Sequence, residues 1–215
     1  MTVPPLLPKH MTHLKHHRRW AALALSLSLL TPWVAQAQNA PTPASASTPK
    51  VRISTSMGDI EAELYADKAP KTVTNFVQYV NDKHYESTIF HRVIPGFMLQ
   101  GGGYDGQYRE KKTRAPVAHE GRQALAAGLK NTTGTLAMAR TNDPQSATAQ
   151  FFINVVDNAF LDPSFQSFGY TVFGKVTSGM DVVQKIRNTP TGAGGPFPTD
   201  VPRTPVVIQS ITLLK

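Results

Sequence analysis

The chain has 215 residues, with 22 Lys and Arg, 14 Asp and Glu, and no cysteine. This length is enough for one domain with a sizeable core. The lack of cysteine excludes disulfides, zinc–thiolate sites and a lipid-modified N-terminal cysteine.

The first 37 residues predict a secretory signal peptide. A basic stretch without acids precedes an apolar run over residues 20–30, and Ala35-Gln36-Ala37 matches the small-x-small cleavage pattern. The apolar run is shorter than the roughly 20 residues of a membrane span, so stable membrane insertion is not expected. Cleavage after Ala37 predicts export to the periplasm, with secretion as the alternative. Met11 is an alternative start.

The positive charge comes partly from this leader. Four of the basic residues lie in it, so the mature chain carries a net charge of +4 instead of +8. Lys111, Lys112 and Arg114 lie near Tyr104 and Tyr108, a combination that could suit nucleic acid. We interpret this stretch as a solvated loop and expect no nucleic-acid partner.

The chain after the leader begins with a linker and a hairpin. Residues 38–49 are rich in Pro, Ala, Ser and Thr without periodicity, which predicts a disordered linker. The folded domain is therefore expected over residues 50–215. Alternating runs at 51–54 and 59–64, separated by Met57-Gly58, predict a first hairpin.

A helix is expected to begin at Pro70, because proline at the first helical position loses no hydrogen bond. Val73, Phe76, Val77 and Val80 then follow at i, i+3, i+4 and i+7. This spacing predicts one apolar stripe packed on a sheet or a barrel end.

Residues 90–103 predict a second hairpin, because two apolar runs flank the turn signal Pro95-Gly96. Strand alternation puts Met98 and Gln100 on one face. With Arg92 one strand away, this mixed surface suits peptide binding better than a core. An ordinary amphipathic hairpin with a solvated arginine is the alternative.

The second half adds short elements. These are an irregular stretch at 104–131, strands at 135–139, 150–155 and 172–176, a helix capped by Ser178, a loop at 191–204 and a strand at 206–213. In the strand at 150–155, alternation places Phe151, Ile153 and Val155 on a core face. Phe152, between two amide side chains, is expected on an outward groove.

About eight short strands and two helices without βαβ alternation predict a mainly β fold. We expect a closed eight-stranded antiparallel barrel capped by two α-helices, because closure removes exposed strand edges. Large residues at alternating core positions predict a filled interior, in contrast to a barrel that carries a small apolar ligand.

Several kinds of chemistry have no matching pattern. No G-x-S-x-G, H-E-x-x-H or phosphate loop occurs. His84, His91 and His119 lack metal-ligand spacing, and no nucleophile accompanies His91, which we interpret as a hydrogen-bonded structural residue. An enzyme of this sequence would need no covalent nucleophile, metal or cofactor.

The motif F-H-R-V-I-P-G-F-M-L-Q-G-G at 90–102 closely resembles the signature of the cyclophilin-type peptidyl-prolyl cis/trans isomerases. The likeness continues through G-T-L-A-M-A-R at 134–140, A-Q-F-F-I-N at 149–154, F-L-D at 160–162 and V-F-G-K-V at 172–176, and spans roughly residues 50–215. It is strongest to the exported bacterial branch. The resemblance implies an eight-stranded barrel capped by two helices.

The resemblance also implies site residues. The catalytic residues would be Arg92 and Gln100, and the substrate-binding residues would be Phe97, Met98, Ala139, Arg140, Gln150, Phe152, Phe160, Leu161 and Tyr170. Strict alternation puts Phe97 opposite Met98, so a strand start or bulge would have to turn it into the groove. Phe160 stands where a tryptophan is usual and Tyr170 where a histidine is usual. Without the indole N–H, cyclosporin sensitivity does not carry over.

The resemblance therefore implies an isomerase that accelerates rotation about X–Pro bonds and assists the folding of exported proteins. Its partners would be proline-containing segments of unfolded or folding chains, and we expect a monomer. The alternative is a non-catalytic chaperone that binds proline-containing peptides on the same barrel.

Overall fold

A computed structural model describes residues 48–215. The predicted signal peptide and most of the predicted linker lie outside these residues. The described chain enters beside the end of the second strand, where the Leu64 N–H donates to the Pro49 carbonyl over 2.8 Å. Within the described range, no helix is both long and apolar enough to cross a bilayer.

The described chain contains eleven strands and four helices. The strands are β1 (Lys50–Thr55), β2 (Gly58–Leu64), β3 (Thr88–Ile89), β4 (Arg92–Ile94), β5 (Met98–Gly101), β6 (Thr135–Met138), β7 (Phe151–Asn154), β8 (Val172–Ser178), β9 (Thr191–Gly194), β10 (Phe197–Pro202) and β11 (Val207–Leu214). The helices are α1 (Pro70–Asn81), α2 (Gly121–Ala126), the 3₁₀ helix η1 (Ala159–Leu161) and α3 (Met180–Arg187).

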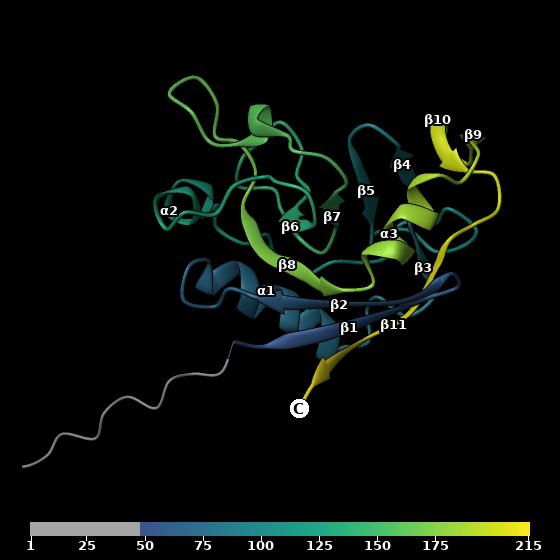
Figure 1. The fold of residues 1–215 in the computed structure, drawn as a ribbon, viewed down its shortest axis with the longest axis horizontal. Coiled ribbons are helices and arrows are strands. Elements are labelled where there is room, and N and C mark those ends of the chain that lie inside the picture. The colour runs from purple at the N-terminus through teal and green to yellow at the C-terminus, as the bar shows by residue number, and fades with distance from the viewer. Residues whose placement is uncertain (1–47) are drawn as a thin grey trace, which may run out of the picture. The chain divides into compact units, whose positions relative to one another are not determined.

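Nine strands form one curled antiparallel sheet in the order β3-β11-β1-β2-β8-β6-β7-β5-β4 (Figure 1). Its edge strands β3 and β4 follow each other in the chain, separated only by Phe90 and His91. The two edges are thus joined by the chain and not by a ladder of hydrogen bonds. The prediction of a mainly β, antiparallel fold is confirmed. The sheet has nine strands instead of the expected eight, and it is curled without being closed, because its edge strands β3 and β4 do not pair with each other.

The interior of the curled sheet is filled. Strand alternation sends one face of β1, β2, β5, β6 and β7 inward, and α1 and α3 add their apolar stripes to the same core. Phe76 of α1 packs against Phe173 at 5.0 Å and Phe151 at 5.5 Å between ring centroids. These large side chains pack against one another in the interior, as the alternating large residues predicted.

The helix predicted from Pro70 is confirmed, and its N-terminus has a partner distant in sequence. The carboxylate of Glu120, itself buried, accepts hydrogen bonds from the backbone N–H groups of Lys71 and Thr72 at 3.1 and 2.8 Å and from the Thr72 hydroxyl at 2.8 Å. A negative charge at this end also complements the helix dipole.

Three elements differ from the predictions. Residues 191–204, expected as a loop, contain the hairpin β9–β10. Its sequence is rich in Gly and Pro and its register is irregular, so it lacks the alternation of apolar and polar residues that predicts a strand. The stretch 104–131 contains α2, which has only six residues and no apolar stripe. Strand β3 has only two residues, too few for any pattern.

The predicted cap of α3 is wrong. Ser178 is the last residue of β8 and pairs with Glu61, while Gly179 occupies the N-cap position with φ of +84°. A Cβ at Gly179 would lie 2.3 Å from the Asp59 carbonyl oxygen. Only glycine satisfies both this left-handed backbone and the close approach of β2.

Candidate active site

The site begins as one row of residues across four strands. The register pairs Arg92 of β4 with Gln100 of β5, Gln100 with Phe152 of β7, and Phe152 with Ala137 of β6. Residues paired in this way point to the same face of a sheet. The adjacent residues Leu99 and Phe151 point into the core instead. The predicted division between core face and outward face is therefore confirmed.

This outward face carries a cavity of about 150 Å³. It is lined by Arg92, Phe97, Met98, Gln100, Ala139, Arg140, Phe152, Leu161 and Tyr170. All nine belong to the predicted site residues, so the structure brings together segments spread over nearly eighty positions of the chain.

The bottom of this cavity is apolar. Met98, Phe152 and Leu161 are buried and form a small cluster separate from the main core. The Tyr170 ring meets the Phe152 ring edge-on, with centroids 5.5 Å apart. Such a pocket suits a small apolar ring better than a polar or charged group.

Phe97 reaches the cavity because it lies in the turn and not in a strand. Its N–H donates to the Ile94 carbonyl over 2.9 Å, and β5 starts only at Met98. The side-chain amide of Asn158 donates to the Phe97 carbonyl over 2.9 Å. Asn158 thus supports the pocket wall, a role that nothing in its sequence context indicated.

Two predicted residues do not line this cavity. Phe160 is 71% exposed and stacks on Phe97, with centroids 5.5 Å apart and planes at 26°. Gln150 lines a neighbouring polar cavity of about 320 Å³ that shares Gln100, Ala139 and Arg140 with the first. The two cavities therefore lie next to each other and share one wall.

Gln100 and Gln150 are joined by a hydrogen bond of 3.1 Å between their side-chain amides. The glycine run after β5 makes room for this contact, because a Cβ at Gly103 would lie 2.5 Å from the Gln150 side chain. A side chain at this position would therefore displace Gln150 from Gln100.

Arg140 is held between the two cavities. Its Nε donates to the Gly169 carbonyl over 3.0 Å, and its Nη1 donates to the Thr141 carbonyl over 2.8 Å. Its guanidinium also lies over the Tyr170 ring at 4.6 Å from the centroid. Arg140 is thereby fixed as a wall of the groove.

The Arg92 side chain is less restrained by neighbouring groups than that of Arg140. Its side chain is 42% exposed, and its guanidinium carbon lies 6.0 Å from the Phe97 ring centroid, at the mouth of the apolar pocket. Among residues 48–215 the only carboxylate within 4.0 Å of it is that of Asp200, with Nε and Oδ2 3.9 Å apart. Asp200 lies in a stretch that the sequence predicted as loop, so it was missed.

His91, next to Arg92, is a buried structural residue. Its ring stacks on Phe197 at 5.1 Å and meets the Tyr104 ring edge-on at 4.8 Å. The predicted hydrogen bonding is not found at Nδ1, which is buried and has no hydrogen-bond partner among the described residues. Burial, and secondarily the charge of Arg92, lowers the pKa of His91 from 6.5 to about 4.

This pKa shift predicts acid sensitivity. The unfolded chain binds a proton at His91 that the folded chain excludes, so the free energy of unfolding falls as pH drops from 6.5 to 4, by about 3 kcal/mol at most. Burial also lowers the pKa of His84 and His119 and adds to the same slope. Urea unfolding of wild type and His91→Gln across this range should show a shallower slope in the variant; equal slopes would contradict the assignment.

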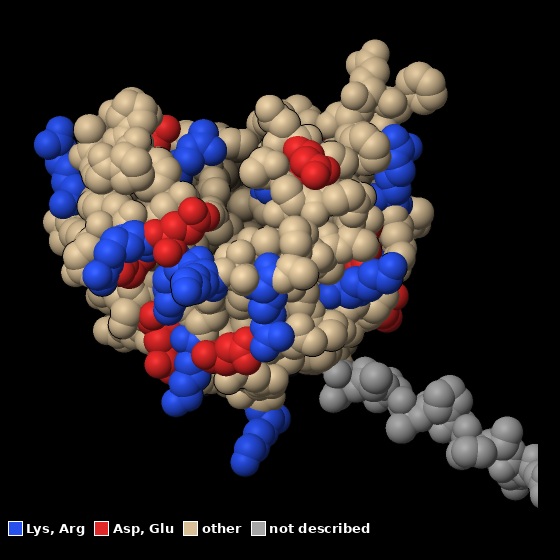
Figure 2. All heavy atoms as spheres, turned by 180° about the vertical axis from the view of Figure 1, so that it is seen from behind, with Lys and Arg blue, Asp and Glu red and all other residues tan. Residues whose placement is uncertain are grey.

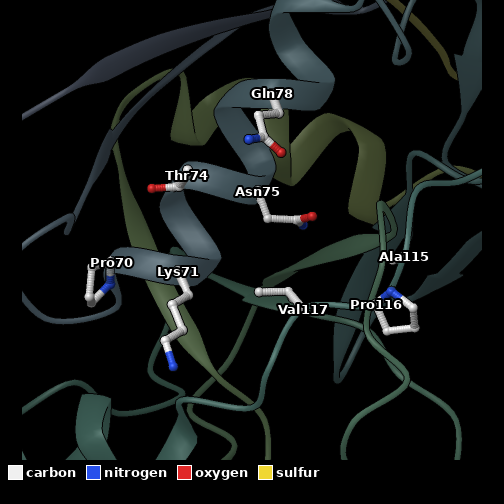
Figure 3. A pocket seen from close by; sticks show the side chains of 8 residues that line it. All are labelled: Pro70, Lys71, Thr74, Asn75, Gln78, Ala115, Pro116 and Val117. Atoms are coloured by element: carbon white, nitrogen blue, oxygen red, sulfur yellow. The ribbon is translucent and has the colours of Figure 1, made fainter.

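A separate hollow of about 410 Å³ lies between α1 and the segment 115–117. Figure 3 shows Asn75 pointing from α1 toward this segment. Lys71 is its only titratable lining residue, so it offers no acid–base pair. Within residues 48–215, no cluster of three or more His, Cys, Asp or Glu side chains could hold a metal ion.

Comparisons with known proteins agree on one family. The family model of the cyclophilin type peptidyl-prolyl cis-trans isomerases matches residues 50–213. A peptidyl-prolyl cis-trans isomerase of Acinetobacter baylyi is 53% identical over 76% of this chain and 84% of its own length. Peptidyl-prolyl cis-trans isomerase B of Escherichia coli is 52% identical over 76% of this chain and 98% of its own.

Solved structures show the same fold. A cyclophilin type isomerase of Cryptosporidium parvum, crystallised in the presence of the dipeptide Ala-Pro, superimposes with a TM-score of 0.60 at 27% identity. The match covers 77% of this chain and 99% of that one. The chain therefore belongs to the cyclophilin-type peptidyl-prolyl cis-trans isomerases. The predicted enzyme class is confirmed.

Proposed function

We propose that the apolar floor of the cavity binds the proline ring of a peptide and that Arg92 catalyses rotation of the bond before it. The observation that carries this proposal is the position of a half-exposed guanidinium at the mouth of a pocket built from Phe97, Met98, Phe152 and Leu161. The Cryptosporidium relative was crystallised in the presence of Ala-Pro, a ligand of the class that such a pocket would accept.

The chemistry needs no covalent step. Rotation about a peptide bond has a barrier of about 18–20 kcal/mol, because the nitrogen lone pair is delocalised into the carbonyl. In the twisted state this lone pair is localised and can accept a hydrogen bond. A donor that bonds only to the twisted state lowers the barrier, whereas equal binding of all states would not. Arginine suits this role because it is protonated at accessible pH and presents several donors in one plane.

The remaining residues position the peptide. We propose that Gln100 and Gln150, joined to each other, steer the carbonyl side of the X–Pro bond. Ala139 and Arg140 would align the peptide backbone beside β6, and Phe160 and Tyr170 would extend the aromatic wall. The domain of residues 50–215 would carry the whole activity.

We further propose that this isomerase acts on exported proteins in the periplasm, or outside the cell if secreted. The support is the leader pattern ending at Ala37 and the uncatalysed isomerisation time of tens of seconds, which can limit folding. A fusion of residues 1–50 to a reporter should be exported and trimmed after Ala37, which fractionation and mass spectrometry of the N-terminus would show.

An isomerisation assay separates catalysis from mere binding. The mature form, added at catalytic amounts, should accelerate a proline-limited refolding reaction and the cis–trans exchange of an Ala-Pro peptide. A chaperone without turnover would instead need amounts similar to the substrate and would leave peptide exchange unchanged.

Phe152→Ala should weaken peptide binding as well as turnover. Phe152 forms the buried floor of the cavity, and truncation removes apolar contact worth about 1.5–3 kcal/mol, or roughly 10- to 150-fold in affinity. Calorimetric titration with a proline-containing peptide measures the change. Phe165→Ala, at a fully exposed phenylalanine outside the cavity, is the matched control. An unaltered affinity in Phe152→Ala would argue against the pocket assignment.

A further inference from the structure

The hairpin β9–β10 brings a carboxylate to the proposed catalytic arginine. β10 contacts β4, the strand that carries Arg92, and Figure 1 shows the hairpin beside that strand. Phe197 of β10 anchors it by stacking on His91 at 5.1 Å and 28°. Three residues further along, Asp200 lies 3.9 Å from Arg92.

The backbone of Asp200 is unusual for a residue with a side chain. Its φ is +66°, in the left-handed region that most residues avoid. Its neighbour Val201 is buried and pairs with Gly192, and the Thr199 hydroxyl donates to Asp200 Oδ2 over 3.0 Å. Such conformations persist only where the surroundings impose them, and they concentrate at functional sites.

The contact between Arg92 and Asp200 involves Nε and leaves the two terminal Nη groups of Arg92 free of this carboxylate. The closest nitrogen to Asp200 is Nε, at the inner edge of the guanidinium. The Phe97 ring lies 6.0 Å from the guanidinium carbon, toward the pocket. The two terminal Nη groups are therefore available to a bound peptide, while the inner edge faces a carboxylate.

We propose that Asp200 is a positioning residue for the isomerase reaction. Its carboxylate attracts the Nε edge of Arg92 and restricts the swing of the guanidinium away from the pocket mouth. This proposal rests on the function proposed for Arg92. It predicts that loss of the carboxylate lowers turnover while peptide affinity stays nearly constant, because the proline pocket itself is untouched.

Asp200→Asn tests this role with little risk to the fold. Asparagine tolerates the left-handed backbone and can still accept the Thr199 hydrogen bond. We expect a fall of about fivefold in kcat/KM for an Ala-Pro peptide, in the range of a partly exposed ion pair, without a matching change in peptide Kd. Asp59→Asn is the matched control, since Asp59 lies 3.8 Å from Arg52 on a strand that contributes nothing to the cavity.

Two further measurements separate positioning from a structural effect. The NMR resonance of the Arg92 Nε–H should shift and broaden in Asp200→Asn and stay unchanged in Asp59→Asn. In an Arg92→Ala background, Asp200→Asn should have no additional effect on residual turnover. Unchanged turnover, or an unchanged Arg92 resonance, in Asp200→Asn overturns the proposal. If Arg92→Ala itself keeps full turnover, the function proposed for Arg92 fails, whatever the resonance of Arg92 shows about its contact with Asp200.

Discussion

Arg92→Ala is expected to lower kcat/KM for X–Pro isomerisation by about 10- to 1,000-fold, which corresponds to roughly 1.4–4 kcal/mol of transition-state stabilisation. The fold should be unaffected, because the side chain is 42% exposed and lines the cavity on the outward face of the sheet. A protease-coupled or refolding-limited proline assay measures the loss, with circular dichroism to verify the fold.

Two variants serve as controls for this result. Arg92→Lys keeps the charge but loses the planar set of donors, so its activity should lie between wild type and Arg92→Ala. Arg52→Ala removes an equally exposed arginine from β1, where it pairs with Glu61, and should leave turnover at the wild-type level. Wild-type turnover in Arg92→Ala would refute the catalytic role proposed for this residue.

Phe151→Ala is expected to lower the free energy of unfolding by about 3–5 kcal/mol, the usual cost of a buried Phe→Ala change. Phe151 is fully buried, and its ring lies edge-on to Phe76 at 5.5 Å and to Tyr85 at 5.6 Å. Truncation would leave a cavity where three aromatic rings now meet. Urea unfolding measures the loss.

The comparison with Phe152→Ala sharpens this prediction. The two phenylalanines are neighbours in β7, but one packs in the barrel core and the other in the peptide cavity. Both changes should lower stability, because both rings are buried, but only Phe152→Ala should also remove direct contact with the peptide. A loss of less than about 1 kcal/mol in Phe151→Ala would mean that its side chain is not part of the core.

The sequence allowed this division to be predicted because strand alternation has a period of two. Once 150–155 is interpreted as a strand, the faces of Phe151 and Phe152 follow. The same holds for Met98 and Gln100 in β5 and for the apolar stripe of α1. Local periodicity predicted most of the strands and helices, and the resemblance to the cyclophilin motifs predicted the site residues.

Other features depend on contacts between distant segments, which periodicity does not report. The Glu120 cap of α1 joins positions nearly fifty residues apart, and Asn158 supports Phe97 across sixty-one positions. The hairpin that brings Asp200 to Arg92 lacks alternating apolar residues, so its Gly and Pro content indicated a loop. Phe160 lies within a stretch that resembles the family motif, but its high exposure depends on how η1 lies beside Phe97.

The most direct test is exchange NMR of an Ala-Pro peptide bound to wild type and to Arg92→Ala, because it measures affinity and the cis–trans rate on the enzyme separately. The proposed role of Arg92 predicts a rate at least tenfold lower in the variant, with a Kd within about a factor of three. An unchanged rate on the enzyme with a weakened Kd would show that Arg92 only binds the peptide, and would contradict selective stabilisation of the twisted bond.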